Sequence, residues 1–160
     1  MAGRVLNLED TGAEGRYQRL VWMPLALRMK LDLAGLKISL ADWQAISLGR
    51  RRALVAGRAE TEAEIGVFVS LLSSSLQAGG RPAAASLAGE KRGGIEVWDD
   101  SARVPAEVAT MAVALGLEVA WPEMERFGRY VLYHFASKGD RDNFAAAVVE
   151  LKVEESGGRP

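Results

Sequence analysis

Apolar residues between Pro24 and Gly35 follow the two-residue period of a half-buried strand. The alternating positions are Leu25, Leu27, Met29, Leu31 and Leu33. These side chains are unbranched or γ-branched helix formers, whereas strands favour Val, Ile and Thr. Pro24 also suits the first turn of a helix, and Gly35 suits the residue after its end. We therefore expect a helix between them.

A second copy of this segment lies 81 residues further along the chain, where Pro24 is matched by Pro105 and Gly35 by Gly116. The second copy has clear helical spacing, since one helix face would carry Val108, Met111, Ala112 and Leu115. The match indicates an internal duplication with an offset of about 81 residues.

After each glycine we expect a short extended step and then a helix with a large apolar side chain, Trp43 in the first copy and Met124 in the second. Ser39 with Asp42 and Pro122 with Glu123 supply residues typical of helix starts. The next pair of helices is expected at Leu48–Ala56 and from about Arg126 to Ala136.

The last helix of the first copy begins with the capping box Thr61-x-x-Glu64. An offset of 79 residues relates its apolar face to the second copy, with Asp140 at the cap there. The matched positions are Ile65, Phe68, Val69 and Leu72 with Phe144, Ala147, Val148 and Leu151.

The pattern predicts one all-α domain over residues 1–160, built from two related three-helix units. Ala78 to Gly94 holds five glycines and a run of alanines and is expected to be a linker or surface loop. The expected segments are an N-terminal arm at 1–22, helical repeats at 24–78 and 104–153, a Gly/Ala-rich linker at 79–101 and a frayed tail at 154–160.

Composition restricts the possible partners and compartments. The formal net charge is −1, too small for a general affinity for nucleic acid. There are no cysteines, and we find neither a signal-peptide pattern nor an apolar stretch suited to a membrane span. We expect a cytoplasmic protein that binds neither nucleic acid nor membrane.

Candidate catalytic groups are few. His134 is the only histidine and lies in an aromatic, apolar stretch, which favours a structural or surface role. No glycine-rich phosphate-binding motif is present. The run Arg50-Arg51-Arg52 spreads around a helix and forms no single basic stripe. We expect no catalytic residue, no metal site and no cofactor.

Ionisable residues interleave with apolar ones in the first helix and just after it, at Arg28, Lys30, Asp32 and Lys37. Arg28 and Asp32 are four residues apart and could form a local ion pair. The alternative is an interaction surface, and these four residues are then its expected contacts. The four tryptophans are either core residues or interface anchors.

The stretch Met23–Leu40 with Trp43 resembles the bacterial nitrate reductase associated protein family. The family pattern is Ile-Pro-Met, Val-Arg-x-Lys-Leu-Asp, Cys-Gly-Ile-Lys-Leu and a following Trp. The C-terminal stretch Arg129–Leu151 is also similar, with Arg-Phe-Ala-Leu, Lys-Leu-Ser, Gly, Asn-Phe and Ala-Leu-x-Glu-Phe in the family. The resemblance covers about two-thirds of the chain and leaves out the Gly/Ala linker. Trp22 and Ala34 stand where the family often has cysteine, and His134 stands near a common lysine.

The resemblance implies a non-enzymatic accessory protein that is encoded with assimilatory nitrate reductase and helps its assembly or maturation. The partner is then nitrate reductase or its precursor, and the mechanism is protein–protein docking. The alternative is a helical small-molecule-binding module with a pocket between the two repeats.

Overall fold

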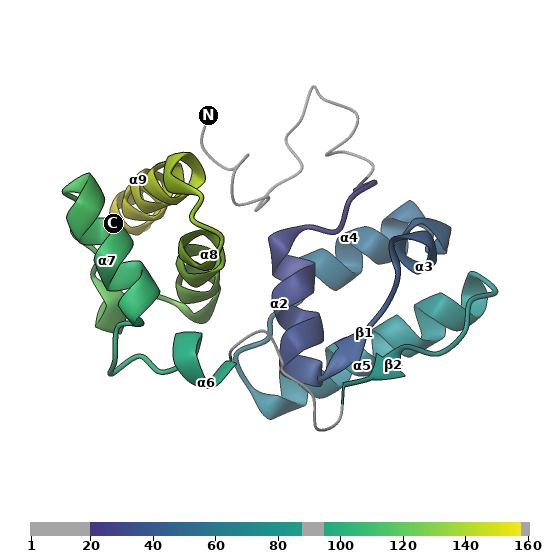
Figure 1. Ribbon diagram of the computed structural model, residues 1–160. Helices are drawn as coiled ribbons and strands as arrows, with labels where there is room; N and C mark the ends of the chain where they lie inside the picture. Colours follow the sequence, from purple (N-terminus) through teal and green to yellow (C-terminus); the bar gives the residue numbers. More distant parts are fainter. Residues whose placement is uncertain (1–19, 88–94, 158–160) are drawn as a thin grey trace. The chain divides into compact units, whose positions relative to one another are not determined.

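A computed structural model describes residues 20–87 and 95–157, with side chains as far as Lys152. The described residues are mostly helical and include one two-stranded sheet (Figure 1). They divide into two compact units, which we call the N-terminal unit (residues 20–87) and the C-terminal unit (residues 95–157). The expected helical fold is confirmed, and the small sheet is an addition to it.

The N-terminal unit is built from four helices and a short antiparallel ladder. Its elements are α2 (Leu25–Ala34), β1 (Leu36–Lys37), α3 (Leu40–Ala45), α4 (Leu48–Ala56), α5 (Glu62–Ala78) and β2 (Ala85–Ser86). The 17-residue helix α5 contacts α2, α3 and α4. In the ladder, Leu36 faces Ser86 and Lys37 faces Ala85.

Helix α2 is buried on two roughly opposite faces, which explains the strand-like alternation of its apolar residues. Leu27 and Leu31 belong to the main core of the N-terminal unit, whereas Leu25 and Met29 are buried outside that core. At 100° per residue these two pairs point in roughly opposite directions. Gly35 ends the helix with a φ of 67°, in the left-handed region that favours glycine.

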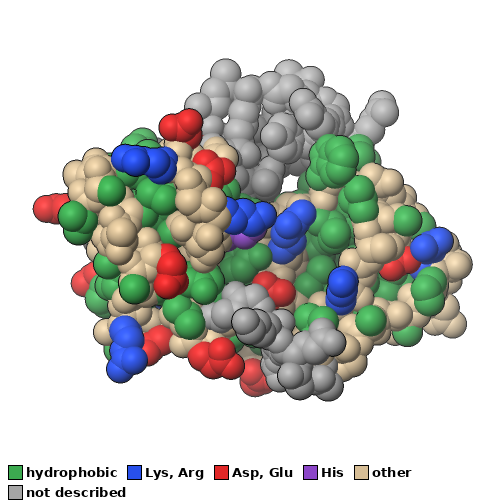
Figure 2. Space-filling model, in the orientation of Figure 1, with side chains coloured by type: hydrophobic (Ala, Val, Ile, Leu, Met, Phe, Trp, Pro, Cys, Tyr) green, Lys and Arg blue, Asp and Glu red, His purple; other side chains and the backbone are tan. Residues whose placement is uncertain are grey.

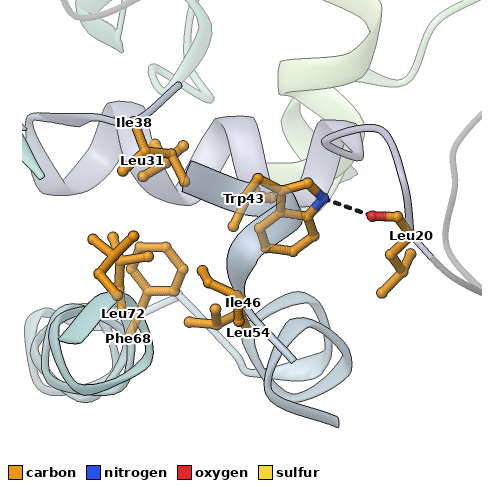
Figure 3. Packing of buried hydrophobic residues seen from close by; sticks show 10 residues of the cluster. Leu20, Leu31, Ile38, Trp43, Ile46, Leu54, Phe68 and Leu72 are labelled. Atoms are coloured by element: carbon orange, nitrogen blue, oxygen red, sulfur yellow. Dashed lines mark hydrogen bonds between the residues drawn. The ribbon is translucent and has the colours of Figure 1, made fainter. Parts of the chain in front are cut away.

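The core of the N-terminal unit gathers one side of α2 with side chains of α3, α4 and α5 around the fully buried Trp43 (Figure 3). Its ten buried residues are Leu20, Leu27, Leu31, Ile38, Trp43, Ile46, Leu54, Phe68, Leu72 and Leu76. Both expected helix starts are confirmed as capping boxes, Ser39 with Asp42 on α3 and Thr61 with Glu64 on α5.

The C-terminal unit is built around α8. Its elements are α6 (Ile95–Trp98), α7 (Ala106–Leu115), the 3₁₀ turn η1 (Trp121–Glu123), α8 (Arg126–Ser137) and α9 (Arg141–Gly157). Helix α8 contacts α6, α7 and α9. The Asp140 side chain accepts a hydrogen bond from the Asn143 backbone N–H at the start of α9, as expected for its cap.

Helix bounds repeat between the units at the expected offsets. Both α2 and α7 have ten residues, and each lies between a proline N-cap and a left-handed glycine 81 residues from its counterpart. Both α5 and α9 have 17 residues, and their bounds differ by 79. The common origin of the two units stays a prediction.

Contacts in the middle of each unit repeat instead at an offset of 78. Trp43 and Trp121 are fully buried, and each indole N–H donates to a backbone carbonyl shortly before the first long helix of its unit. Arg51 and Arg129 each donate to the carbonyl of the residue five positions earlier. The structural counterpart of Trp43 is therefore Trp121, and the expected match with Met124 is wrong.

Several expected segment bounds also differ. The segment at 79–101 contains β2 and α6, and Trp98 is fully buried, so it is more than a Gly/Ala-rich linker. An apolar side chain as large as tryptophan outweighs the surrounding glycines, because its burial removes a large area from water. Helix α9 continues through residues 154–157, where a frayed tail was expected. Residues 1–19 of the expected arm and 158–160 of the tail lie outside the described residues.

Candidate functional site

The four expected contact residues occupy α2 and β1, but they do not form one exposed group. Arg28 and Lys37 are exposed, Asp32 is half-buried and Lys30 is buried. On the face shown in Figure 2, basic and acidic side chains of the described residues are interspersed with apolar ones. This face therefore carries no broad patch of a single charge sign among the described residues.

Lys30 is a buried helix cap rather than a contact residue. Its Nζ donates to the carbonyl oxygens of Leu54 and Val55, each at 2.7 Å. Both carbonyls lie in the last turn of α4, where they lack partners within the helix and attract a positive charge. The ammonium also lies 5.9 Å from the centre of the Phe68 ring. These bonds fix α2 to the end of α4, and the buried ammonium group is not accessible to a partner protein.

Burial governs the ionisation of Lys30 and of Asp32. Desolvation lowers the pKa of the Lys30 ammonium from 10.5 to about 8. Desolvation also raises the pKa of the Asp32 carboxyl from 3.8 to about 6, and the charge of Arg28 opposes that shift. The charge of Arg28 thus acts on Asp32 from a distance. The local ion pair considered from the sequence does not form, since no contact within 4 Å joins their charged groups among the described residues.

The chain enters α2 through a strained and firmly held turn. Leu20 has a φ of 48°, a left-handed conformation that is uncommon for leucine. Its carbonyl accepts hydrogen bonds from Trp43 Nε1 at 2.7 Å and Arg51 Nη1 at 3.0 Å. The carbonyl of Val21 accepts one from Gln44 Nε2 at 3.2 Å. Three donors from α3 and α4 therefore hold the backbone in place.

Trp22 follows this turn and is 59% exposed, while the other three tryptophans are fully buried. A fixed backbone with an exposed indole suits an interface anchor, because tryptophan offers a large contact area at a low cost in conformational entropy. Sequence reasoning left the core and interface roles of Trp22 open. The run Leu20–Met23 is apolar throughout, so no local pattern in the sequence marks Trp22 as exposed.

In the C-terminal unit, a buried arginine ties α8 to the segment after α6. Arg129 donates to the carbonyls of Trp98 and Met124 and lies 3.5 Å from a carboxylate oxygen of Asp99. Arg126 forms a two-pronged ion pair with the same carboxylate, at 3.0 and 3.2 Å. This network orders a loop and uses its charges internally.

His134 lies in an aromatic environment on α8, with ring centres 6.0 Å from Tyr130 and 5.4 Å from Phe135. Among the residues that the structure describes, no group of three or more His, Asp or Glu side chains is placed to hold a metal ion. These observations give His134 packing neighbours and no identified chemical role.

A cavity of about 130 Å³ lies between α8, α9 and the extended segment that follows α7. Its apolar lining consists of Val119, Ala120, Met124, Leu132, Val148 and Leu151. Glu118 and Lys152 complete the lining, and both side chains are exposed. All these residues belong to the C-terminal unit, so this cavity is a feature of one unit alone.

Comparison with protein families provides an identification. The family model of the conserved nitrate reductase-associated protein matches residues 14–151. The chain belongs to this family. The match covers all of the N-terminal unit and most of the C-terminal unit, and it confirms the resemblance of the Met23–Leu40 stretch. Neither the curated proteins nor the solved structures give a match to this nitrate reductase-associated chain. None of its described helices is long and apolar enough to cross a membrane.

Proposed function

We propose that this chain is a non-enzymatic accessory protein that docks on nitrate reductase, or on its precursor, in the cytoplasm and assists its assembly or maturation. Membership of the nitrate reductase-associated family is the observation that carries the proposal. Docking is transient and holds the reductase in a state that can receive its cofactor.

The docking surface is centred on the segment that leads into and out of α2, and we call it the α2 surface. Its residues are Trp22, Arg28, Asp32 and Lys37. Trp22 supplies the apolar anchor, while Arg28 and Lys37 supply exposed positive charges. Asp32 is a half-buried neighbour of Arg28.

Lys30 supports this surface from within. It holds α2 against α4 through two hydrogen bonds, so the exposed residues of α2 keep a fixed orientation. A surface that is ordered before binding loses less conformational entropy on association. The contact role first expected for Lys30 therefore becomes a supporting role.

The test is retention of purified nitrate reductase on the immobilised full chain. We expect Trp22→Ala, and separately the double variant Arg28→Glu with Lys37→Glu, to weaken retention about tenfold, because an anchor or two complementary charges are lost. The matched control is Arg103→Glu with Lys138→Glu, which reverses two exposed charges of the C-terminal unit.

Circular dichroism establishes that each variant is folded. If the α2 variants retain the reductase as well as the control does, the α2 surface is wrong. If the unsubstituted chain retains neither the mature reductase nor its cofactor-free form, direct docking is wrong.

A further inference from the structure

The two units differ in the extended segment that follows their first left-handed glycine, which is paired with a strand in only one of them among the described residues. In the N-terminal unit, β1 follows the left-handed glycine of α2 and pairs with β2, and the N–H of Leu87 extends the ladder to the carbonyl of Gly35. In the C-terminal unit, the left-handed Gly116 is followed by the extended segment 117–120, which we call the open edge. No strand pairs with it among the described residues.

Backbone groups of the open edge are available for pairing. The N–H of Leu117 bonds to Ala112 at the end of α7, and the carbonyl of Ala120 accepts from Glu123. Within the described parts of the chain, the N–H and C=O groups of Glu118 and Val119 have no hydrogen-bond partner. Unpaired groups of this kind are a template for the addition of an extended strand.

The cavity lies directly against this edge, since Glu118, Val119 and Ala120 contribute to its lining. Three other lining residues, Met124, Leu132 and Leu151, match core residues of the N-terminal unit at the offsets of 78 and 79. The counterparts are Ile46, Leu54 and Leu72, which belong to the buried core around Trp43. The C-terminal unit thus has a cavity beside positions whose counterparts are core residues.

Side-chain volumes also differ between the two units. The core residue Phe68 of α5 is matched by Ala147 on α9 at the offset of 79, so a ring is replaced by a methyl group. Across the ladder of the N-terminal unit, β2 brings Ala84 to the position beside Ile38, and Ala84 packs on the core. The matching place in the C-terminal unit, beside Val119, borders the cavity.

We propose that the C-terminal unit binds an extended segment of a partner protein at the open edge. The segment pairs antiparallel with Leu117–Ala120, as β2 pairs with β1, and inserts one aliphatic side chain into the cavity. A cavity of about 130 Å³ suits a side chain the size of leucine. Neither Glu118 nor Lys152 forms an ion pair among the described residues, so both charges are available to the flanking polar residues of that segment. This site is separate from the α2 surface and does not depend on the proposed function.

The existing strand provides the probe. We use a fluorescein-labelled peptide of residues 81–87, Arg-Pro-Ala-Ala-Ala-Ser-Leu, and the same peptide with Ala84→Leu. Anisotropy with the full chain should show saturable binding of the leucine peptide below 1 mM. We expect it to bind about tenfold more tightly than the alanine peptide, because the larger side chain buries more apolar surface.

Two protein variants test the cavity. Leu151→Phe places a ring at the cavity wall and should weaken binding of the leucine peptide at least tenfold. Val149→Phe makes a comparable change on a 57% exposed position of the same helix and should leave binding unchanged. Equal affinities for the two variants would overturn the proposal, as would absence of binding by the unsubstituted chain at 1 mM.

Amide hydrogen exchange of the unsubstituted chain gives a readout that survives misfolding of any variant. The peptide should slow exchange at the amide of Glu118 by at least tenfold, because Glu118 matches Lys37, whose backbone groups face β2, whereas the N–H of the next residue, Val119, points away from the added strand. Unchanged exchange at saturating peptide overturns strand addition. Slow exchange without peptide, independent of protein concentration, would assign the edge to a segment of this same chain. Slow exchange that rises with concentration would assign it to a second copy. Both results overturn a partner protein as the occupant.

Discussion

Helices α4 and α8 begin 78 residues apart in their respective units, and they end by different means. In the N-terminal unit α4 is followed by Gly57 in an extended conformation, and its last carbonyls receive the buried ammonium of Lys30. In the C-terminal unit α8 is followed by Gly139 with a φ of 67°, and the N–H groups of Gly139 and Asp140 bond to Ala136 and Phe135.

The difference shows that the last carbonyls of a helix can find hydrogen-bond donors either in the neighbouring backbone or in another helix. The glycine cap of α8 uses only neighbouring backbone groups. The lysine cap of α4 joins two helices, since the side chain comes from α2 and the carbonyls from α4. The position on α7 that matches Lys30 at the offset of 81 is Met111, which has no charge to donate. Only the N-terminal unit therefore makes its packing dependent on this ammonium.

The largest effect is expected for Lys30→Met. Methionine fills a similar volume but leaves the carbonyls of Leu54 and Val55 without their donor in a buried place. The loss of two charge-assisted bonds exceeds the relief from desolvation, and we expect the free energy of unfolding to fall by about 2 kcal/mol. Urea denaturation of the full chain measures it. The matched control is Met111→Leu on α7, for which we expect a loss below about 1 kcal/mol. Equal losses would show that the lysine is no more than a filler.

A smaller effect is expected from pH, because the lowered pKa of Lys30 makes stability depend on protonation. The unfolded chain keeps this proton up to about pH 10.5, whereas the folded chain loses it near pH 8. The unfolded state therefore binds more protons between these values, so stability rises with pH in that window. Relative to Lys30→Met, the unsubstituted chain should gain about 1 kcal/mol between pH 7.5 and 9.

Denaturation midpoints of the two proteins at each pH provide this difference. Their comparison removes the titration of the other lysines and tyrosines, which both chains share. Parallel stability profiles would contradict a deprotonation of Lys30 in the folded state.

The smallest effects concern the two glycines after the helices. Gly139→Ala should cost about 1 kcal/mol, because alanine is strained at positive φ although the space for its methyl group is open. Gly57→Ala should be neutral or slightly stabilising, since its φ of −61° suits alanine and its nearest neighbours lie at ordinary contact distances. Thermal unfolding of both variants compares them, and the reverse order would contradict the assignment of the two caps.

Local sequence signals predicted the helix starts and ends well. A proline before the helix and a glycine after it marked the ends of α2, and the same two residues recur 81 positions later around α7. The two capping boxes also form as expected. These signals act within a few residues, so they do not need a tertiary context. The extended step at β1 was expected after Gly35, but its pairing with β2 escaped prediction because a strand of two residues carries no readable period.

The site was harder to predict than the fold. The burial of Lys30 depends on carbonyls 24 and 25 residues away, and no local pattern of α2 distinguishes it from the exposed Arg28. The match of Trp43 with Trp121 was present in the sequence at an offset of 78, together with that of Arg51 with Arg129. A single fixed offset of 81 concealed both, because Trp121 follows the end of α7 by six residues, whereas Trp43 follows the end of α2 by nine.

The double burial of α2 also has a bearing on how related chains change over time. Its first four alternating apolar residues, Leu25, Leu27, Met29 and Leu31, are all buried on one side of the helix or the other, which leaves few neutral replacements at these positions. We expect substitutions at these positions to exchange leucine, methionine and isoleucine for one another, because such changes nearly conserve volume. We expect charged residues only on the narrow surfaces between the two buried sides. A relative recognised by little else should still preserve this every-second-residue rhythm between its proline and its glycine.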